Sequence, residues 1–498
     1  MSKAVTSYSK VNLFGLILGP LLAFLVFFLI PNDMIAYEGR VVLSAVALIG
    51  TYWVTEAIPM AAASLIPLIY IPLFGGAPVG VVSGGYSEPV IFMYMGGFIL
   101  AIAIEKWNLH RRIALSIIDF IGTESHKIIL GIMLATGLLT MFISNAATAL
   151  MMLPVALALI SEVRDKKVLS GQNMNYFAKA ILLAVAYTAT IGGLATLVAA
   201  VPNAALAGIA SIQFGVEVTF VQWLMFAGPV AFIMFIVLYF YLTKIRFKVK
   251  VDDQKPVTFI KEEKKKLGKI KTEEWIVIAV FLMTVSLWVG KPLILYIANN
   301  VGFLSFLENL GNLPDASISM FGAILLFFLP STQPGERILK WEDLVKLPWG
   351  VLVLFGGGLA LASSLEHSGV NAWIAVALEG LQAYTPFIII LLLVIIVLGM
   401  TEILSNTAVA NLVLPISAGL GIAIGIDPLL MMAAVALAAG SCYMLPVATP
   451  PNTAVFSAGE LEISDMARAG VWLNIVSVIV ITLAVYYWMP VVFGIERP

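Results

Sequence analysis

The chain has 498 residues, of which 61% are apolar and 11% are charged, and its formal net charge is −1. Soluble domains carry about 25% charged residues, so the composition excludes a soluble globular protein and predicts an all-α polytopic membrane protein. A near-neutral chain with one local basic stretch is also unlike a nucleic-acid-binding protein, and a single cysteine, Cys442, excludes an internal disulfide framework.

Apolar runs of the kind that cross about 30 Å of hydrocarbon recur along the whole chain. Two apolar regions are interrupted, 177–215 at Pro202-Asn203 and 429–462 at Pro450-Pro451-Asn452, and we interpret each as a broken helix. Together with the uninterrupted runs they predict 11 transmembrane spans. The uninterrupted runs fall near 11–30, 39–56, 58–74, 89–109, 221–243, 273–298, 317–330, 349–367 and 466–493.

Two other apolar regions, 127–160 and 385–420, have polar centres. The centres are Ser144-Asn145-Ala146 and Ser405-Asn406-Thr407, which lie 261 residues apart (405 − 144). Non-helical backbone at membrane depth is tolerated where it lines a protein-enclosed cavity. We therefore predict two re-entrant hairpins with these motifs at their tips. Polar side chains in a bilayer usually mark a functional site, so the tips are the predicted binding site.

Charge predicts the topology. The stretch from Lys244 to Lys271 holds 11 Lys or Arg residues and should be cytoplasmic. Counting spans from there places the N-terminus, with Lys3 and Lys10, inside and the C-terminus outside. The first polar run has basic flanks and the second does not, which predicts an inverted repeat of the kind found in secondary transporters. The predicted domains are an N-terminal helix at 1–38, a first repeat at 39–243, a basic, solvated cytoplasmic linker at 244–272 and a second repeat at 273–498.

The predicted site contains no Lys, Arg or His, so its donors are amides, hydroxyls and backbone N–H groups at helix ends. Asn145, Asn406 and Thr407 suit carboxylate oxygens, and two opposed tips suit a substrate with a carboxylate at each end. Ser144, Ser405 and the carbonyls of the broken helices could instead hold Na⁺. A buried glutamate such as Glu402 could carry a proton. ATP-binding and hydrolase motifs are absent from the sequence, which predicts that the chain is not an enzyme.

Three segments resemble the divalent anion/Na⁺ symporter family of di- and tricarboxylate transporters: residues 53–59 (WVTEAIP), Thr401-Glu402 leading into Ser405-Asn406-Thr407, and residues 448–452 (ATPPN). The resemblance implies a homodimeric elevator, in which a transport domain carrying both hairpins and both broken helices slides against a scaffold. It implies substrate contacts at Ser144, Asn145, Ala146, Ala200, Val201, Ser405, Asn406, Thr407, Thr449 and Pro450. It implies Na⁺ near Ser144, Asn145, Gly192, Asn203, Ser405, Asn406, Ala448 and Asn452.

The first half departs from the family pattern, with Ala146 and Ala200-Val201 where Thr and Thr-Pro are expected. Because these changes remove hydroxyls from the first-half Na⁺ site, the sequence favours Na⁺-independent exchange of C4 or C5 dicarboxylates (succinate, malate, fumarate or 2-oxoglutarate). Na⁺-coupled symport is the alternative. An inorganic divalent anion permease, an anion channel and the membrane subunit of an ATP-driven importer are the competing classes. The expected partners are the dicarboxylate, membrane lipid and a second copy in the cytoplasmic membrane, with no cofactor beyond Na⁺ and no nucleic acid.

Overall fold

A computed structural model describes residues 9–31, 33–122, 124–169, 171–248, 259–300 and 308–498. The chain is 79% helix without β-strands in this described part, which confirms the predicted all-α class. Nine helical segments there are long and apolar enough to cross a membrane, and six shorter ones are also apolar. Three parts of the sequence-based predictions fall outside the described residues. They are Lys3, which we predicted to lie inside, the centre of the linker (249–258), and residues 301–307 of the predicted outer loop.

The helices follow the predicted apolar runs. Up to the linker they are α1 (Lys10–Leu29), α2 (Tyr37–Thr55), α3 (Met60–Ala63), α4 (Pro67–Leu73), α5 (Val79–Gly84), α6 (Pro89–Lys106), α7 (Leu109–Ile121), α8 (Ser125–Thr140), α9 (Asn145–Asp165), α10 (Gly171–Leu194), α11 (Val201–Phe214) and α12 (Phe220–Phe240). From the linker onward they are α13 (Phe259–Lys266), α14 (Thr272–Asn300), α15 (Glu308–Gly311), α16 (Asp315–Phe328), α17 (Trp349–His367), α18 (Val370–Ala377), α19 (Pro386–Thr401), α20 (Asn406–Ile424), α21 (Pro428–Ala439), α22 (Pro450–Phe456), α23 (Ile463–Leu483) and α24 (Met489–Phe493).

The duplicated pattern extends over many helices. The pairs α8–α9 and α19–α20 each turn at a four-residue tip, and their second helices begin 261 residues apart (406 − 145). The broken helices have the same form in both repeats, because α10 ends and is continued by α11, and α21 ends and is continued by α22. Even the π-helical turns that follow α12 and α23 correspond, at Tyr241–Arg246 and Ala484–Trp488. Two short helices that we did not predict, α7 and α18, also correspond, because each follows a residue with positive φ, Asn108 and Gly369.

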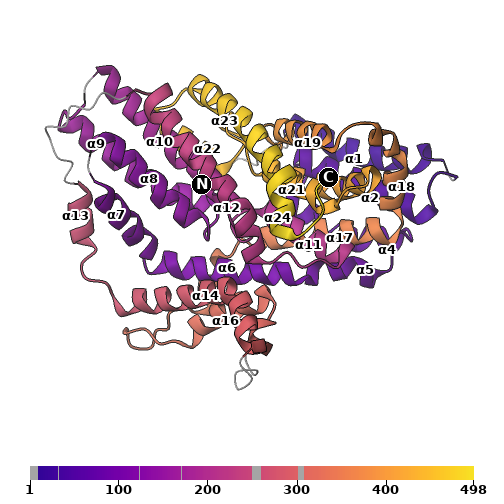
Figure 1. Ribbon diagram of the computed structural model, residues 1–498, viewed down its shortest axis with the longest axis horizontal. Coiled ribbons are helices and arrows are strands. Elements are labelled where there is room, and N and C mark those ends of the chain that lie inside the picture. Colours follow the sequence, from indigo (N-terminus) through magenta and orange to yellow (C-terminus); the bar gives the residue numbers. More distant parts are fainter. Residues whose placement is uncertain (1–8, 32, 123, 170, 249–258, 301–307) are drawn as a thin grey trace, which may run out of the picture.

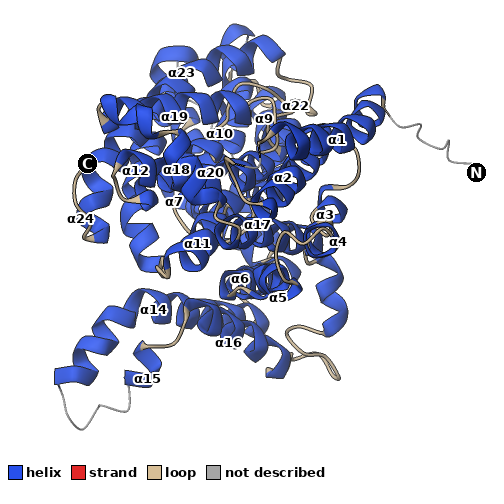
Figure 2. Cartoon of the chain, turned by 90° about the vertical axis from the view of Figure 1, so that its right-hand side faces the viewer, coloured by secondary structure: helices blue, strands red, loops and turns tan. Residues whose placement is uncertain are grey.

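Figure 1 places α7, α8 and α9 toward one end of the longest axis and α1, α2, α18 and α19 toward the other. In both views α14 and α16 lie together along the lower edge, beside α6, against which α16 packs closely (Figure 2). Helices α10, α12, α21 and α23 lie between the two ends and hold the two helix pairs in place.

The two repeats exchange partners around the broken helices. Helix α9 of the first helix pair packs against α22, which belongs to the second repeat. Reciprocally, α20 of the second helix pair packs against α11 of the first repeat. Each helix that starts at a polar motif therefore lies beside the broken helix of the other repeat, so the two halves build one central structure.

We had expected a solvated linker between the repeats, but part of the linker packs against the rest of the protein. Its helix α13 packs on α7, with Ile260 completely buried. Arg111 pairs with Glu263, and Lys264 Nζ lies 2.7 Å from Asp119 Oδ2. The sequence of α13 explains this difference, because Ile260 provides one apolar contact and its Glu and Lys side chains pair with charged residues of α7.

Candidate functional site

The first polar motif starts a helix. Ser144 is the N-cap of α9, where its Oγ accepts a hydrogen bond from the Ala147 N–H at 3.4 Å, and Asn145 is the first helical residue. The Asn145 amide lies flat against Gly193 of α10, where a Cβ would overlap it. Thr140, the last residue of α8, is completely buried, and its Oγ1 lies 2.9 Å from Asn145 Oδ1 and 3.0 Å from the Ala189 carbonyl oxygen.

The second motif repeats this arrangement. Asn406 starts α20, and Thr401 Oγ1 lies 2.6 Å from Asn406 Oδ1 and 2.9 Å from the Ala439 carbonyl oxygen. Cys442 Sγ lies 3.3 Å from the same amide oxygen. Each tip therefore gathers a threonine hydroxyl, an asparagine amide and a main-chain carbonyl of the broken helix. Thr140 was not singled out from the sequence, and Thr401 was quoted within a family-like segment without a role in the site. Their shared distance of five residues from the motif asparagine could have revealed both.

The two Pro-Asn breaks tie the interrupted helices together. Asn203 Nδ2 donates to the carbonyls of Gly193, Leu194 and Thr196, at 2.9 to 3.2 Å. Asn452 Nδ2 donates to the Leu445 carbonyl at 3.0 Å. The Oδ1 atoms of both asparagines are buried and have no hydrogen-bond partner among the described residues. Unpaired buried oxygens are costly, so this matched pair marks places where an ion or water would be stabilised.

The breaks differ at the residues where the sequence departs from the expected family pattern. Thr449 caps α22, because its Oγ1 accepts a hydrogen bond from the Asn452 N–H at 3.3 Å. Ala200 occupies the same place before α11 and cannot cap it. The missing hydroxyls at Ala146 and Ala200 are separate from Thr140, which holds Asn145 in the first repeat just as Thr401 holds Asn406 in the second.

Glu402 joins the second tip to two other elements. Its Oε1 accepts from the Tyr443 N–H at 2.9 Å, the Met444 N–H at 3.2 Å and Asn474 Nδ2 at 2.6 Å, and its Oε2 accepts from the Met444 N–H at 3.0 Å. The corresponding residue in the first repeat is Met141, whose carbonyl accepts a hydrogen bond from the Thr196 hydroxyl. A buried negative charge is therefore present in one half only.

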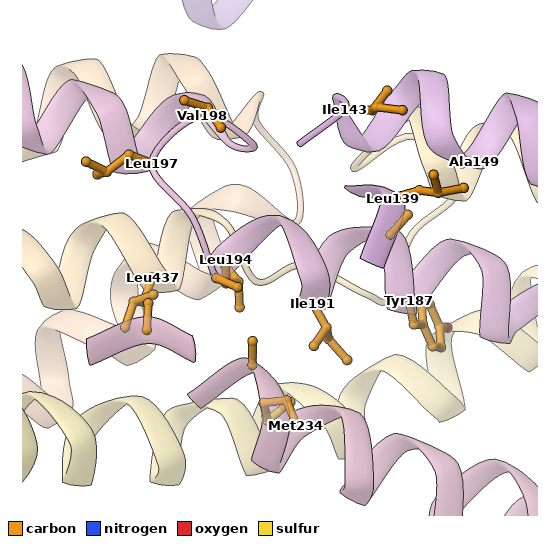
Figure 3. Close-up of a cluster of buried hydrophobic side chains, with 14 of the residues drawn as sticks. Leu139, Ile143, Ala149, Tyr187, Ile191, Leu194, Leu197, Val198, Met234 and Leu437 are labelled. Carbon is orange, nitrogen blue, oxygen red and sulfur yellow. The ribbon is translucent and has the colours of Figure 1, made fainter. Parts of the chain in front are cut away.

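Apolar side chains enclose the first tip. Figure 3 shows Leu139 and Ala149 from the helix pair, Tyr187, Ile191 and Leu194 from α10, and Leu197 and Val198 from the break, with Met234 of α12 and Leu437 of α21 beside them. These side chains are all buried. The Thr140 hydroxyl and the Ala189 carbonyl, which belong to completely buried residues, thus lie in apolar surroundings, where electrostatic interactions are stronger than in water.

The predicted site residues fall at the starts of four helices. Ser144, Asn145 and Ala146 open α9, Ser405, Asn406 and Thr407 open α20, Ala200 and Val201 open α11, and Thr449 and Pro450 open α22. The other residues considered for Na⁺ lie beside them. Gly192 packs beneath Thr140, where a Cβ would overlap the threonine methyl, and the Ala448 carbonyl oxygen lies 3.9 Å from Cys442 Sγ. Helix α9 contacts α22 and α11 contacts α20, so the helices that carry these residues pack in one crossed arrangement.

Comparison with known proteins gives one family. Residues 11–494 match the family model described as the sodium:sulfate symporter transmembrane region. The chain is 42% identical to a sodium-dependent dicarboxylate transporter, SdcS, of Staphylococcus saprophyticus, over 98% of this chain and 94% of that protein. It is also 42% identical to SdcS of Staphylococcus aureus, over 99% of this chain and 94% of that protein.

Solved structures with the same fold are more distant in sequence. The YdaH transporter of Alcanivorax borkumensis superposes with a TM-score of 0.57 at 13% identity, covering 92% of this chain and 98% of that chain. MtrF of Neisseria gonorrhoeae superposes with a TM-score of 0.55 at 12% identity, covering 99% of this chain and 97% of that chain. At these identities the likeness concerns the fold alone.

Proposed function

The chain belongs to the divalent anion/Na⁺ symporter family, and on that premise we propose that it is a Na⁺-coupled transporter of C4 and C5 dicarboxylates. A multi-pass membrane protein of this family is a transporter and not an enzyme. Two relatives, each 42% identical over nearly their whole length, are named sodium-dependent dicarboxylate transporters, which supports both the substrate class and the ion.

The observation that carries the proposal is the duplicated group of oxygen atoms. In each repeat a threonine hydroxyl faces both an asparagine Oδ1 and a main-chain carbonyl within 2.6 to 3.0 Å. One hydroxyl has one proton, so it cannot donate to both acceptors at once. Oxygen lone pairs then converge without enough donors, which is an arrangement that a hard cation stabilises. Na⁺ is a small hard cation of this kind, so the residues present fit it.

The asparagine amide also explains how the ion and the substrate would depend on each other. With Oδ1 turned toward the threonine, Nδ2 of Asn145 or Asn406 is turned away from it and is free to donate to a carboxylate. A single planar group would then contact Na⁺ with one edge and the dicarboxylate with the other. Binding of either one fixes the amide for the other, so each would raise the affinity for its partner.

The helix starts supply the remaining attraction for an anion. Helices α9, α11 and α20 begin at the site with main-chain N–H groups that have no intrahelical acceptor, and a helix N-terminus carries roughly half a positive charge. Carboxylates bind well to such positions. Two helix pairs, each contributing one motif, suit the two carboxylates of a substrate such as succinate, malate, fumarate or 2-oxoglutarate.

This proposal replaces the sequence-based preference for Na⁺-independent exchange. That preference rested on hydroxyls missing at Ala146 and Ala200. The Thr140 and Asn145 group is present in spite of these changes, and the relatives' names favour the Na⁺-coupled alternative. We therefore assign the coupling ion to groups that include the Thr140 and Thr401 hydroxyls, which were not among the Na⁺ ligands expected from the sequence.

For the transport cycle we propose an elevator. Both helix pairs and both broken helices (127–160, 177–215, 385–420 and 429–462) would move as one body, which their crossed packing supports. The remaining helices of the 39–243 and 273–498 repeats would form a scaffold, in a homodimer whose N-termini face the cytoplasm and whose C-termini face outward. Sulfate is the second candidate substrate, because the matching family model is described by sodium:sulfate symport.

The test is uptake of radiolabelled succinate into proteoliposomes that contain only this protein. We expect saturable uptake that requires an inward Na⁺ gradient, proceeds in empty vesicles and is inhibited by excess malate more than by excess sulfate. Uptake that requires internal dicarboxylate and is independent of Na⁺ would support the exchange hypothesis instead. Ohmic, non-saturating anion current would indicate a channel, and labelled sulfate uptake without succinate uptake would indicate an inorganic anion permease.

A further inference from the structure

A cavity of about 650 Å³ lies between α19 and α23, beside the tip of the second helix pair. Most of its walls are apolar, with Ile395 and Leu398 on α19, Ile403 in the tip that follows α19, and Ile475, Val478 and Ile479 on α23. Several of these side chains, such as Ile403 at 77% exposure and Ile479 at 53%, also lie on the apolar outer surface. The cavity therefore opens toward the part of the surface that faces lipid in a membrane protein, and its volume is in the range of ligand pockets.

Glu402 brings a charge to this cavity. It lines the cavity and keeps 6% of its surface exposed. All of its hydrogen bonds come from neutral donors, and no Lys, Arg or His pairs with it among the described residues. Oε2 accepts a single N–H, so it has capacity for another donor. A carboxylate in apolar surroundings without a cationic partner is costly, so a cation placed against it would be stabilised.

The cavity also has room for a chain of carbon atoms. Gly399 lines it one turn before Glu402, and a Cβ added there would meet nothing within 4 Å. An alkyl group lying past Gly399 would contact the isoleucine and leucine side chains of both helices. The neighbouring Asn474 has a buried Oδ1 without a partner among the described residues, so the polar end of the cavity offers a second acceptor oxygen beside Glu402.

We propose that this cavity is a binding site for small amphiphilic amines, with the alkyl chain between α19 and α23 and the ammonium group against Glu402. Charge complementarity selects this class over the alternatives. An alkyl carboxylate would place a second negative charge beside Glu402, and an alkyl alcohol would donate one hydrogen bond without neutralising the charge. An ammonium group donates a hydrogen bond to Glu402 and also neutralises its charge.

Occupancy would act on transport through Glu402. This carboxylate holds the main-chain N–H groups of Tyr443 and Met444 and the side chain of Asn474, so it links the second tip to the broken helix and α23. An ammonium group that shares the carboxylate weakens these hydrogen bonds without occupying the dicarboxylate site. Inhibition would therefore persist at saturating substrate. This effect rests on the proposed function, whereas binding of the amine does not.

Covalent labelling tests the binding directly. In the reaction with dicyclohexylcarbodiimide the Glu402 carboxylate and a proton taken from water add across one C=N bond, so that oxygen bonds to carbon, the proton goes to nitrogen and nothing leaves. The purified protein is treated with this apolar reagent, and labelled Glu402 is measured by peptide mass spectrometry. N,N-dimethyloctylamine is the probe, because a tertiary amine cannot be acylated, and octan-1-ol and octanoate are compounds of matched chain length.

We expect Glu402 to be labelled, and we expect the amine to suppress the labelling while octan-1-ol and octanoate leave it unchanged. Gly399→Leu and Val478→Trp fill the cavity from its two walls, and either should abolish the labelling. Gly80→Leu is the matched control, because a Cβ at Gly80 also meets nothing within 4 Å but lies in α5. An unlabelled Glu402, equal protection by octan-1-ol, or full labelling in both filled variants would overturn the proposal.

Transport supplies the second measurement. We expect N,N-dimethyloctylamine to reduce the maximal rate of succinate uptake in proteoliposomes without raising the substrate concentration for half-maximal uptake. Gly399→Leu should transport normally and resist the amine. If succinate is not transported at all, the proposed function fails and the labelling result still decides the binding site. Inhibition that excess succinate relieves would overturn the site beside Glu402.

Discussion

Thr401 Oγ1 lies 2.6 Å from Asn406 Oδ1, and Thr140 Oγ1 lies 2.9 Å from Asn145 Oδ1 at the same place in the other repeat. Each threonine is the last residue of the first helix in its pair and each asparagine is the first residue of the second. The contact therefore closes both tips in the same way. It also places a hydroxyl, which can serve as an ion ligand, directly behind the group proposed to hold the substrate.

Removing one of these hydroxyls should weaken the response to Na⁺. Thr401→Val keeps the side-chain shape and loses the oxygen. A lost interaction of about 1.4 kcal/mol corresponds to about a tenfold change in affinity, so we expect the Na⁺ concentration for half-maximal succinate uptake to rise about tenfold. Thr401→Ser should behave like the parent. An unchanged Na⁺ dependence in Thr401→Val would show that the hydroxyl has no part in ion binding.

A side chain at Gly193 should disturb the candidate site, because a Cβ there would overlap the Asn145 amide. We expect Gly193→Ala to fold, since one methyl group is added beside a single side chain, but to displace Asn145 and lower succinate uptake at least about tenfold. Gly228→Ala on α12 is the matched control, because its Cβ would make an ordinary 3.5 Å contact with Leu224. Parental uptake by Gly193→Ala would mean that the Asn145 position is not needed.

Arg112 should stabilise the junction of the linker and α14. Its Nε lies 2.8 Å from Glu274 Oε1, both side chains are largely buried, and its guanidinium also donates to the carbonyls of Leu267, Gly268 and Lys269. Breaking a buried pair on one side costs about 3–5 kcal/mol, so Arg112→Met should markedly lower the melting temperature in detergent. The double variant Arg112→Met, Glu274→Met should melt above the single variant. Equal melting of Arg112→Met and the parent would contradict this role.

The contact between α13 and α7 should depend on pH. Hydrogen bonds from Lys266, together with the nearby Arg111 guanidinium, hold the pKa of the Glu263 carboxyl below its usual value of 4.5. A lowered pKa means that the stabilisation is fully present above pH 4.5 and is lost as the pH falls through the lowered value. Glu263→Gln should therefore reduce the melting temperature at pH 7, and its difference from the parent should shrink below pH 4.5.

The matched variant for this measurement is Glu262→Gln on the same helix. Glu262 belongs to neither of the ion pairs that join α13 to α7. The Glu262→Gln variant should therefore have the melting temperature of the parent protein at every pH. A difference between Glu263→Gln and the parent that stays constant with pH would show that packing, and not the charge of Glu263, holds α13 in place.

Much of the architecture could be predicted from sequence because hydrophobic runs and helix breakers are local signals. The tips at Ser144 and Ser405 and the breaks at Pro202 and Pro451 coincide with the ends of helices in the structure. The helices α7 and α18 were missed because they are short and lie beside longer apolar runs. Residues 58–74 were expected as one span but form α3 and α4, since Pro67 starts a new helix.

The candidate site was predicted less completely. Asn145 and Asn406 were recognised because a motif names them. Thr401 stands in a segment that resembles the family but was given no role in the site, and Thr140 looks like an ordinary residue of an apolar helix. Their role depends on the Ala189 and Ala439 carbonyls, which come from helices 49 and 38 residues away in the chain. Main-chain carbonyls carry no sequence signal. The preference for exchange failed for this reason, because it counted only the hydroxyls that the motif includes.

The crossed packing of α9 on α22 and α11 on α20 has a consequence for biosynthesis. When the ribosome has made the first repeat, α9 and α11 have been inserted without the neighbours that they contact in the finished protein. The tip at Asn145 already has Thr140 and Gly193 of its own repeat, but α9 and α11 lack α22 and α20 until the second repeat is made. The nascent first half is thus inserted in the membrane before the helices that pack against α9 and α11 exist. Assembly of the transport site is therefore one of the last events in the folding of the chain.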